Sequence, residues 1–182
     1  MQQFWERFLV GRSDRQTIAK HARGMDRYVG VLTLFAAALL GLGSAAPFAT
    51  VQNFYGLNGQ FSLLTAALEL FKTGDTAYAA GIAILFAVLP VFSIATVFDL
   101  WYKYALHEEK TDRLIARARL CGRLWFLVMI ATLALVYYTQ TSSADAVLHL
   151  PVYYLIASVL IQKVILSRVS RLLALVQYVE ES

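Results

Sequence analysis

The chain has 182 residues, of which 59% are hydrophobic and only 15% are charged, and its formal net charge is +4. A soluble domain carries about 25% charged residues, so this composition excludes an ordinary soluble domain. The basic residues flank apolar segments, which favours anionic lipid over nucleic acid as their partner. The single cysteine excludes an internal disulfide and a CxxC metal site.

Four apolar segments predict an all-α, polytopic membrane protein whose transmembrane domain covers residues 28–166. Each segment approaches the roughly 20 apolar residues that a spanning helix needs. The predicted spans are residues 28–51, 76–100, 124–139 and 146–166. All lysines and arginines except Lys72 lie toward one side of these spans, and Lys163 lies near that end of the fourth span. Because basic residues near short loops stay in the cytoplasm, both termini and the middle loop should be cytoplasmic.

Residues 1–27 predict a basic, amphipathic cytoplasmic segment ahead of the first span. Four large apolar residues recur there at helical spacing: Phe4, Trp5, Phe8 and Leu9. This pattern indicates a helix lying in the membrane interface. A cleaved signal peptide is the rival interpretation, with a site at Ser44-Ala45-Ala46. However, the charged region before the apolar run is too long for an ordinary signal peptide.

Pro47, near the outer end of the first span, removes a backbone donor and should kink or end that helix. Residues 52–75 then form the only external segment of any size. An aromatic turn is predicted first, followed by a short amphipathic helix that Ser62 would cap. We expect this helix to lie on the outer surface or to cover the bundle as a lid. The candidate contacts with an external partner are Phe54, Tyr55, Phe61, Leu64 and Leu68.

Pro90 lies inside the second span, breaks one helical hydrogen bond and should kink the helix. Kinks at both prolines would give the bundle room for a cavity, although a packing kink alone is the simpler interpretation. Asp99 lies near the cytoplasmic end of this span and could pair with Arg123 at the start of the third. Such a pair would join two helices, and a proton or ion relay is the open alternative.

The sequence contains no phosphate loop, no nucleophile–base arrangement and no paired intramembrane carboxylates, so we predict no enzyme activity, no cofactor and no metal site. A haem would need two axial histidines at matching depth, whereas His107 is predicted inside and His149 outside. A secondary transporter would need a charged residue at mid-membrane and a second repeat. Residues 167–182 predict an amphipathic cytoplasmic C-terminal helix.

The order of these features resembles the paraquat-inducible protein A family of bacterial inner-membrane proteins. The matching features are Pro47, the external helix Ser62–Lys72 followed by Gly74, Pro90 in the second span, and Gly122-Arg123 leading into the third. The resemblance covers about residues 28–170. It corresponds to one short unit, without the CxxC zinc ribbons of the long family members.

The resemblance implies a multi-pass protein of the bacterial inner membrane with a role in lipid transport or envelope maintenance. Its partners would be membrane lipids and other membrane or periplasmic subunits, and a kinked bundle could hold an acyl chain. The alternative is a non-catalytic accessory subunit of a larger membrane complex, respiratory or photosynthetic. The absence of a recognisable site and the amphipathic segments at both ends favour that alternative.

Overall fold

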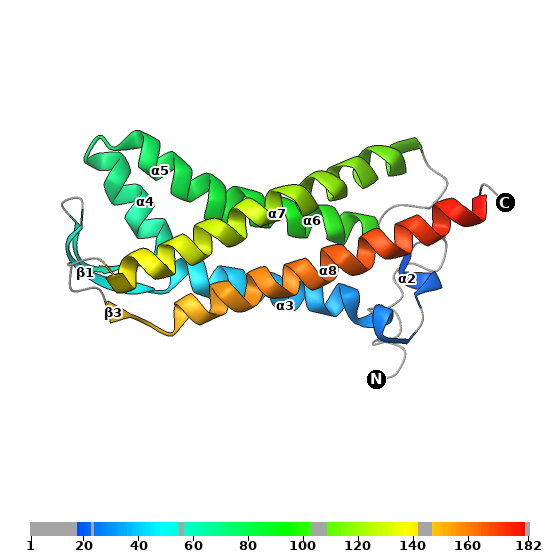
Figure 1. Cartoon of the computed structure of the whole chain (residues 1–182), viewed down its shortest axis with the longest axis horizontal. Coiled ribbons are helices and arrows are strands. Elements are labelled where there is room, and N and C mark those ends of the chain that lie inside the picture. Colours follow the sequence, from blue (N-terminus) through cyan, green and yellow to red (C-terminus); the bar gives the residue numbers. More distant parts are fainter. Residues whose placement is uncertain (1–17, 23, 55–56, 103–108, 142–146, 181–182) are drawn as a thin grey trace.

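Four long helical segments pack side by side, and a small sheet lies at one end of them (Figure 1). This computed structural model describes residues 18–22, 24–54, 57–102, 109–141 and 147–180. Four helices are long and apolar enough to cross a membrane: Gly24–Ala45, Thr76–Tyr102, Ala116–Tyr138 and Pro151–Leu172. The prediction of four helices of spanning length is confirmed. The predicted interfacial helix in residues 1–17 lies outside the described residues.

The first span consists of a short 3₁₀ turn, η1 (Gly24–Tyr28), and the helix α3 (Val29–Ala45). The helix ends at Ala45 because Pro47 follows closely. A proline disfavours the helical conformation in the residue before it, and Ala46 is extended, with φ −79° and ψ 150°. The predicted end of this span, at residue 51, is therefore wrong. The apolar run continues past Pro47, but it continues as a strand.

A three-stranded antiparallel sheet covers this end of the bundle, and the expectation of an all-α fold did not include it. Its strands are β1 (Ala49–Phe54), β2 (Leu57–Phe61) and β3 (Val147–Leu148), in the order β2-β1-β3. Thr50 pairs with Gln60 of β2 and with Val147 of β3. The sheet therefore ties the segment after the first span to the segment before the last one. We call this end of the molecule the sheet end.

A short helix precedes the second span, and the span itself passes through a π turn. Helix α4 (Leu63–Lys72) packs against α5 (Thr76–Ala83), which continues through η2 (Ile84–Val88) into α6 (Leu89–Tyr102). The π turn directly precedes Pro90. A proline ring clashes with the carbonyl four residues earlier, and the wider turn relieves that clash. In Figure 1, α5 and α4 accordingly lean away from the other helices.

The last two spans belong to long continuous helices, α7 (Glu109–Thr141) and α8 (Pro151–Glu180). The basic segment before the third span is thus part of the same helix. The start of the fourth span near residue 146 is wrong, because β3 precedes α8 and Pro151 occupies its first position, which suits proline. The C-terminal residues to Glu180 extend α8 rather than forming a separate helix.

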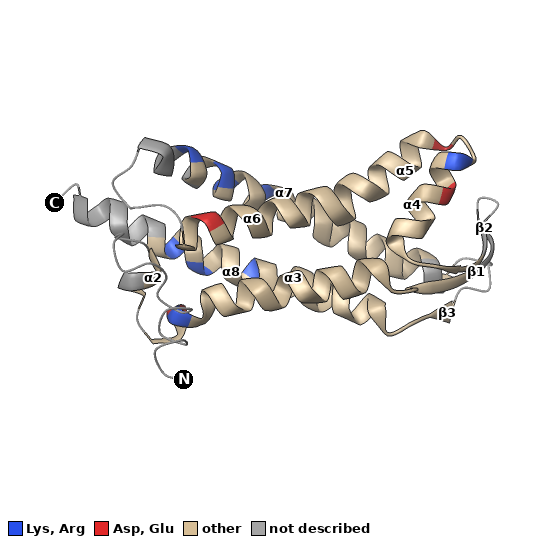
Figure 2. Cartoon of the chain, turned by 180° about the vertical axis from the view of Figure 1, so that it is seen from behind, with Lys and Arg blue, Asp and Glu red and all other residues tan. Residues whose placement is uncertain are grey.

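Positive charge gathers at the end of the bundle opposite the sheet (Figure 2). We call it the basic end. Arginines of α7 and α8 lie there, whereas Lys72 lies at the sheet end beside Glu69, with which it forms an ion pair of 2.8 Å. The short helix α2 (Ile18–His21) packs on α6 at the basic end. Since both α2 and the end of α8 lie there, the chain crosses the bundle an even number of times (Figure 1).

The interior consists of two apolar clusters, one at each end. The cluster at the basic end includes Trp101, Leu100 and Val169, and that at the sheet end includes Leu40, Phe86 and Leu155. Buried polar side chains also lie inside the bundle, and the described ones in the spans are Thr33, Ser44, Ser93, Thr96, Thr132, Ser158 and Gln162. Small hydroxyl residues are common where membrane helices approach closely, because they bond across the interface or to their own helix.

Candidate functional site

Two polar residues of α8 form a hydrogen-bonded chain in the interior of the bundle. Ser158 is completely buried, and its Oγ donates to the backbone carbonyl of Ala36 in α3 at 2.8 Å. Gln162, one turn further along, donates from Nε2 to Ser158 Oγ at 3.2 Å. A glutamine amide carries two N–H donors and a carbonyl acceptor. Gln162 therefore retains hydrogen-bonding capacity beyond this chain.

The buried threonines are bound within their own helices. Thr33 donates to the carbonyl of Val29 at 2.7 Å, and Thr96 donates to that of Phe92 at 2.8 Å. Thr132 does the same with Val128. Such bonds to the carbonyl four residues earlier use up the hydroxyl proton. The threonines therefore offer few donors to a ligand, in contrast to Gln162.

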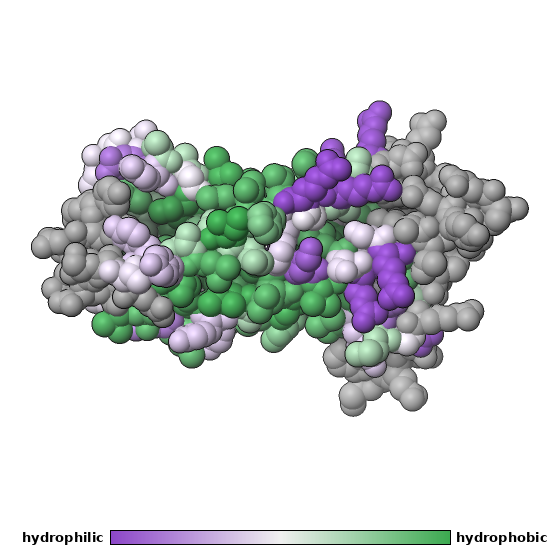
Figure 3. Space-filling model, in the orientation of Figure 1, coloured by the Kyte–Doolittle hydropathy of each residue, from purple (hydrophilic) through white to green (hydrophobic). Residues whose placement is uncertain are grey.

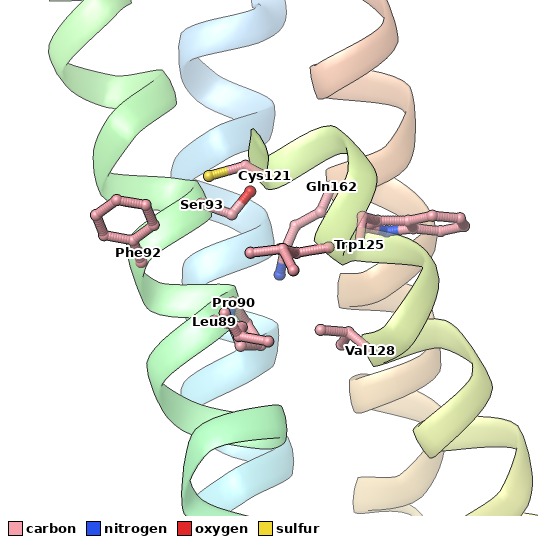
Figure 4. Close-up of a pocket in the computed structure, with 9 residues that line it drawn as sticks. Leu89, Pro90, Phe92, Ser93, Cys121, Trp125, Val128 and Gln162 are labelled. Carbon is pink, nitrogen blue, oxygen red and sulfur yellow. The ribbon is translucent and has the colours of Figure 1, made fainter. Parts of the chain in front are cut away.

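A partly open cleft lies between α6 and α7 where Pro90 interrupts the helix (Figure 4). Its lining is Leu89, Pro90, Phe92, Ser93, Cys121, Leu124, Trp125, Val128 and Gln162. The walls are apolar, and the polar groups come from one residue on each of three helices: Ser93, Cys121 and Gln162. Its volume is about 10 Å³, which is room for about one water molecule.

Ser93 and Gln162 also line a second recess of about 10 Å³, together with Thr33 of α3 and Ile165 of α8. The two residues therefore stand between both recesses. The thiol of Cys121 is buried and free, and it lies near the Ser93 and Thr96 hydroxyls. In Figure 4 the side chains of Ser93 and Cys121 point toward each other. Polar groups from α6, α7 and α8 thus converge beside Pro90.

Of the five bundle residues singled out from the sequence, only Pro90 lines this cleft. Pro47 lies exposed between α3 and β1, at the sheet end. Asp99 is partly exposed and has an interaction partner, and Arg123 is exposed on α7. The ion pairs seen among the described residues do not include one between Asp99 and Arg123. Gly122 follows Cys121, and a Cβ at Gly122 would meet no atom within 4 Å.

The residues predicted to contact an external partner divide into two groups. Phe61 is half-buried and packs on the cluster at the sheet end. Leu64 and Leu68 are 49% and 60% exposed, and Phe71, one turn later on α4, is 65% exposed. Helix α4 buries its other face through Leu63, Ala66 and Leu70. The side chain of Phe54 and all of Tyr55 lie outside the described part of the structure.

Sequence reasoning missed Ser93, Ser158 and Gln162. The available signal was the four-residue spacing of Ser158 and Gln162 inside an otherwise apolar span, which places both on one helix face. Within the described residues, no three histidine, cysteine or acidic side chains form a group that could hold a metal ion. Comparisons of the chain with protein-family models, curated proteins and solved structures find no match.

Proposed function

We propose that this chain is a multi-pass protein of the bacterial inner membrane, of the paraquat-inducible protein A type, that takes part in lipid transport or envelope maintenance. The observation that carries the proposal is the cleft beside Pro90, where apolar walls lead to the polar side chains of Ser93 and Gln162. Mostly apolar sites with a few placed polar groups are typical of ligand pockets. Phospholipids match this chemistry, since acyl chains suit the walls and ester carbonyls accept hydrogen bonds.

The small volume of the cleft determines how a lipid would bind. A volume of about 10 Å³ is too small to enclose an acyl chain. The acyl chain would therefore stay outside the bundle, although the sequence had suggested that a kinked bundle could hold one. It would lie along the outside of η2 and α6, where Val88, Val91 and Phe92 are exposed. Only the ester region would reach toward Gln162. The protein would therefore hold a lipid at its surface and not inside the bundle.

Replacing Gln162 with leucine tests the proposal. Gln162→Leu removes the amide that would bind the ester, whereas Ser158 keeps its bond to Ala36. We expect mass spectrometry of the protein purified in mild detergent to find co-purified phospholipid reduced about fivefold or more, because one hydrogen bond contributes roughly 1 kcal/mol. Deletion of the gene should raise envelope permeability, and the wild-type gene should restore it.

The matched control is Gln60→Leu, because Gln60 is exposed on β2 at the sheet end. It should leave the amount of bound lipid unchanged. Size-exclusion profiles of both variants establish that they remain folded. If the wild-type protein enriches no lipid over empty micelles, and deletion leaves permeability unchanged, the proposed function is wrong.

A second candidate is a non-catalytic accessory subunit of a larger membrane complex, respiratory or photosynthetic. The exposed stripe of Leu64, Leu68 and Phe71 on α4 favours it, because exposed apolar patches often mark contacts with other proteins. On a native gel of gently solubilised membranes, the chain should then migrate with a larger assembly, and Leu68→Glu should release it. Migration of the wild-type chain as a monomer would exclude this role. Neither candidate involves a catalytic step, a cofactor or a metal.

A further inference from the structure

Lys163 lies well inside the span Pro151–Leu172. A charged side chain at such a place is costly unless it has a partner or reaches the interface. The ion pairs among the described residues do not include Lys163. Its contact is with the ring of Trp125, whose centroid lies 4.8 Å from Nζ. A cation above an indole face is attracted by the ring, and the ammonium keeps its N–H donors for an anion.

The ring of Trp125 is fixed in place beneath this lysine. Its Nε1 donates to the backbone carbonyl of Val159 in α8 at 2.8 Å. Figure 4 shows the indole extending from α7 toward α8, away from Ser93. Rotation of the ring would break the hydrogen bond, so the ring and the ammonium above it are held in position before any ligand arrives.

Further donors continue along the same face of α8 toward the basic end. Ser167 and Arg171 follow Lys163 at four-residue intervals, and all three are exposed. Residues at this spacing lie above one another on one side of a helix. Arg168, by contrast, donates to Asp26 at 3.3 Å and is already engaged. On the adjacent α7, the turn before Trp125 carries Gly122, whose missing side chain leaves open space.

The hydrophilic surface near the basic end borders the apolar surface of the bundle (Figure 3). Leu160 and Val164 of α8 and Phe126 of α7 are 54%, 52% and 57% exposed, and they belong to the apolar side. A molecule that matches both sides has an anionic head and apolar tails. Anionic phospholipids bind basic pockets between membrane helices in this way.

We propose that the exposed surface of α7 and α8 formed by Lys163, Ser167, Arg171, Gly122 and Trp125 binds the phosphate of an anionic glycerophospholipid. The lipid comes from the membrane leaflet at the basic end. Lys163 and Arg171 hold the phosphate, Ser167 donates to it, and Trp125 positions the ammonium of Lys163. The proposal does not rest on the function proposed above: Trp125 also lines the cleft beside Pro90, but the phosphate site uses neither Ser93 nor Gln162.

Native mass spectrometry of the purified full chain in detergent tests this site, with phosphatidylglycerol and phosphatidylcholine of identical acyl chains as the two probes. We expect the wild-type protein to bind one phosphatidylglycerol more tightly than phosphatidylcholine. Lys163→Met should weaken phosphatidylglycerol binding about fivefold, as expected for the loss of one basic contact, and should leave phosphatidylcholine unaffected. Trp125→Phe should weaken it too, because the ring loses its bond to Val159.

The control is Arg117→Met, which removes the same charge from an exposed position on α7 that lies about two turns before Trp125 and about 140° around the helix from Gly122. It should change phosphatidylglycerol binding by less than about twofold, as a general surface charge would. Inorganic phosphate at the same concentration should not displace the lipid. The proposal is wrong if the two lipids bind equally, if Lys163→Met and Arg117→Met have equal effects, or if phosphate alone displaces the lipid. Gln162→Leu should leave this binding intact, which separates the two sites.

Discussion

Two glycines of α3, two positions apart, have opposite surroundings. A Cβ on Gly43 would lie 2.6 Å from Leu155 Cγ and 3.0 Å from the backbone nitrogen of Leu155 in α8. A Cβ on Gly41 would meet nothing within 4 Å. Close approach of two helices requires a small residue at the contact. Gly43 therefore sets the distance between α3 and α8, whereas Gly41 faces outward.

Alanine at these two positions should change stability in opposite directions. Gly43→Ala should destabilise the protein by about 1–3 kcal/mol, because the backbone of α8 must move. Gly41→Ala should be neutral or stabilise it by up to about 1 kcal/mol, since alanine is the better helix former. Thermal unfolding in one detergent measures both. Equal shifts of the two midpoints would contradict the close packing at Gly43.

The sequence identified Pro90 as a residue of interest but not the polar groups around it. A proline alters the helix through its own backbone, so its effect can be predicted from the sequence without knowledge of the fold. Ser93 and Gln162 contribute to the candidate site because both face inward and line the same cleft. Helices that are apolar all round give no polar face from which the inward side can be read. The four-residue spacing of Ala37, Gly41 and Ala45 favours Gly41 as the packing residue, and this interpretation is wrong because Gly43 makes the close contact.

Among the helices and strands, α4 was the most predictable from the sequence. Ser62 accepts a hydrogen bond from the backbone N–H of Thr65 at 3.1 Å, and Thr65 Oγ1 accepts one from the Ser62 N–H at 2.8 Å. These local bonds depend on neighbours in the sequence alone, so a sequence pattern reports them. Gly74 follows the helix with a positive φ of 93°, which suits glycine.

Loss of this cap should loosen the first turn of α4. Ser62→Ala removes the side-chain acceptor and should cost about 1 kcal/mol locally. Hydrogen exchange at the amides of Thr65 and Ala66 should become about fivefold faster. Ser170→Ala, at an exposed position on α8, is the matched control and should leave exchange in α4 unchanged. Unchanged exchange in Ser62→Ala as well would mean that packing on α5 alone holds the turn.

The sheet was less predictable than α4. Residues 49–51 are mostly apolar and extend the first hydrophobic run, so hydropathy alone assigned them to the span. What makes them a strand is pairing on both sides: Ala49 opposes Phe61 in the neighbouring β2, and on the other side it opposes Leu148 in β3, which is distant in the sequence. Thr50 Oγ1 and His149 Nε2 lie 2.8 Å apart beside this pairing. Long-range partners of this kind leave no local signature in the sequence.

At the scale of the whole molecule, the charge asymmetry predicts that the basic end faces the cytoplasm. In a Cys121→Ser background, Lys72→Cys should react with a membrane-impermeant maleimide in spheroplasts. Arg113→Cys should react only after permeabilisation, since it lies at the basic end of α7. Both positions are exposed, so access to the reagent depends on the side of the membrane. The reverse labelling pattern would invert the orientation.

The packing of α3 against α8 also has a consequence for biosynthesis. The bond from Ser158 to Ala36 spans 122 residues of sequence, and Gly43 likewise contacts Leu155. A ribosome adds about 5–20 residues per second, so the first span waits about 6–24 s before its main neighbour exists. During that interval its contact face must be covered by lipid or by an insertion chaperone. The first helix to enter the membrane is thus among the last to reach its final packing.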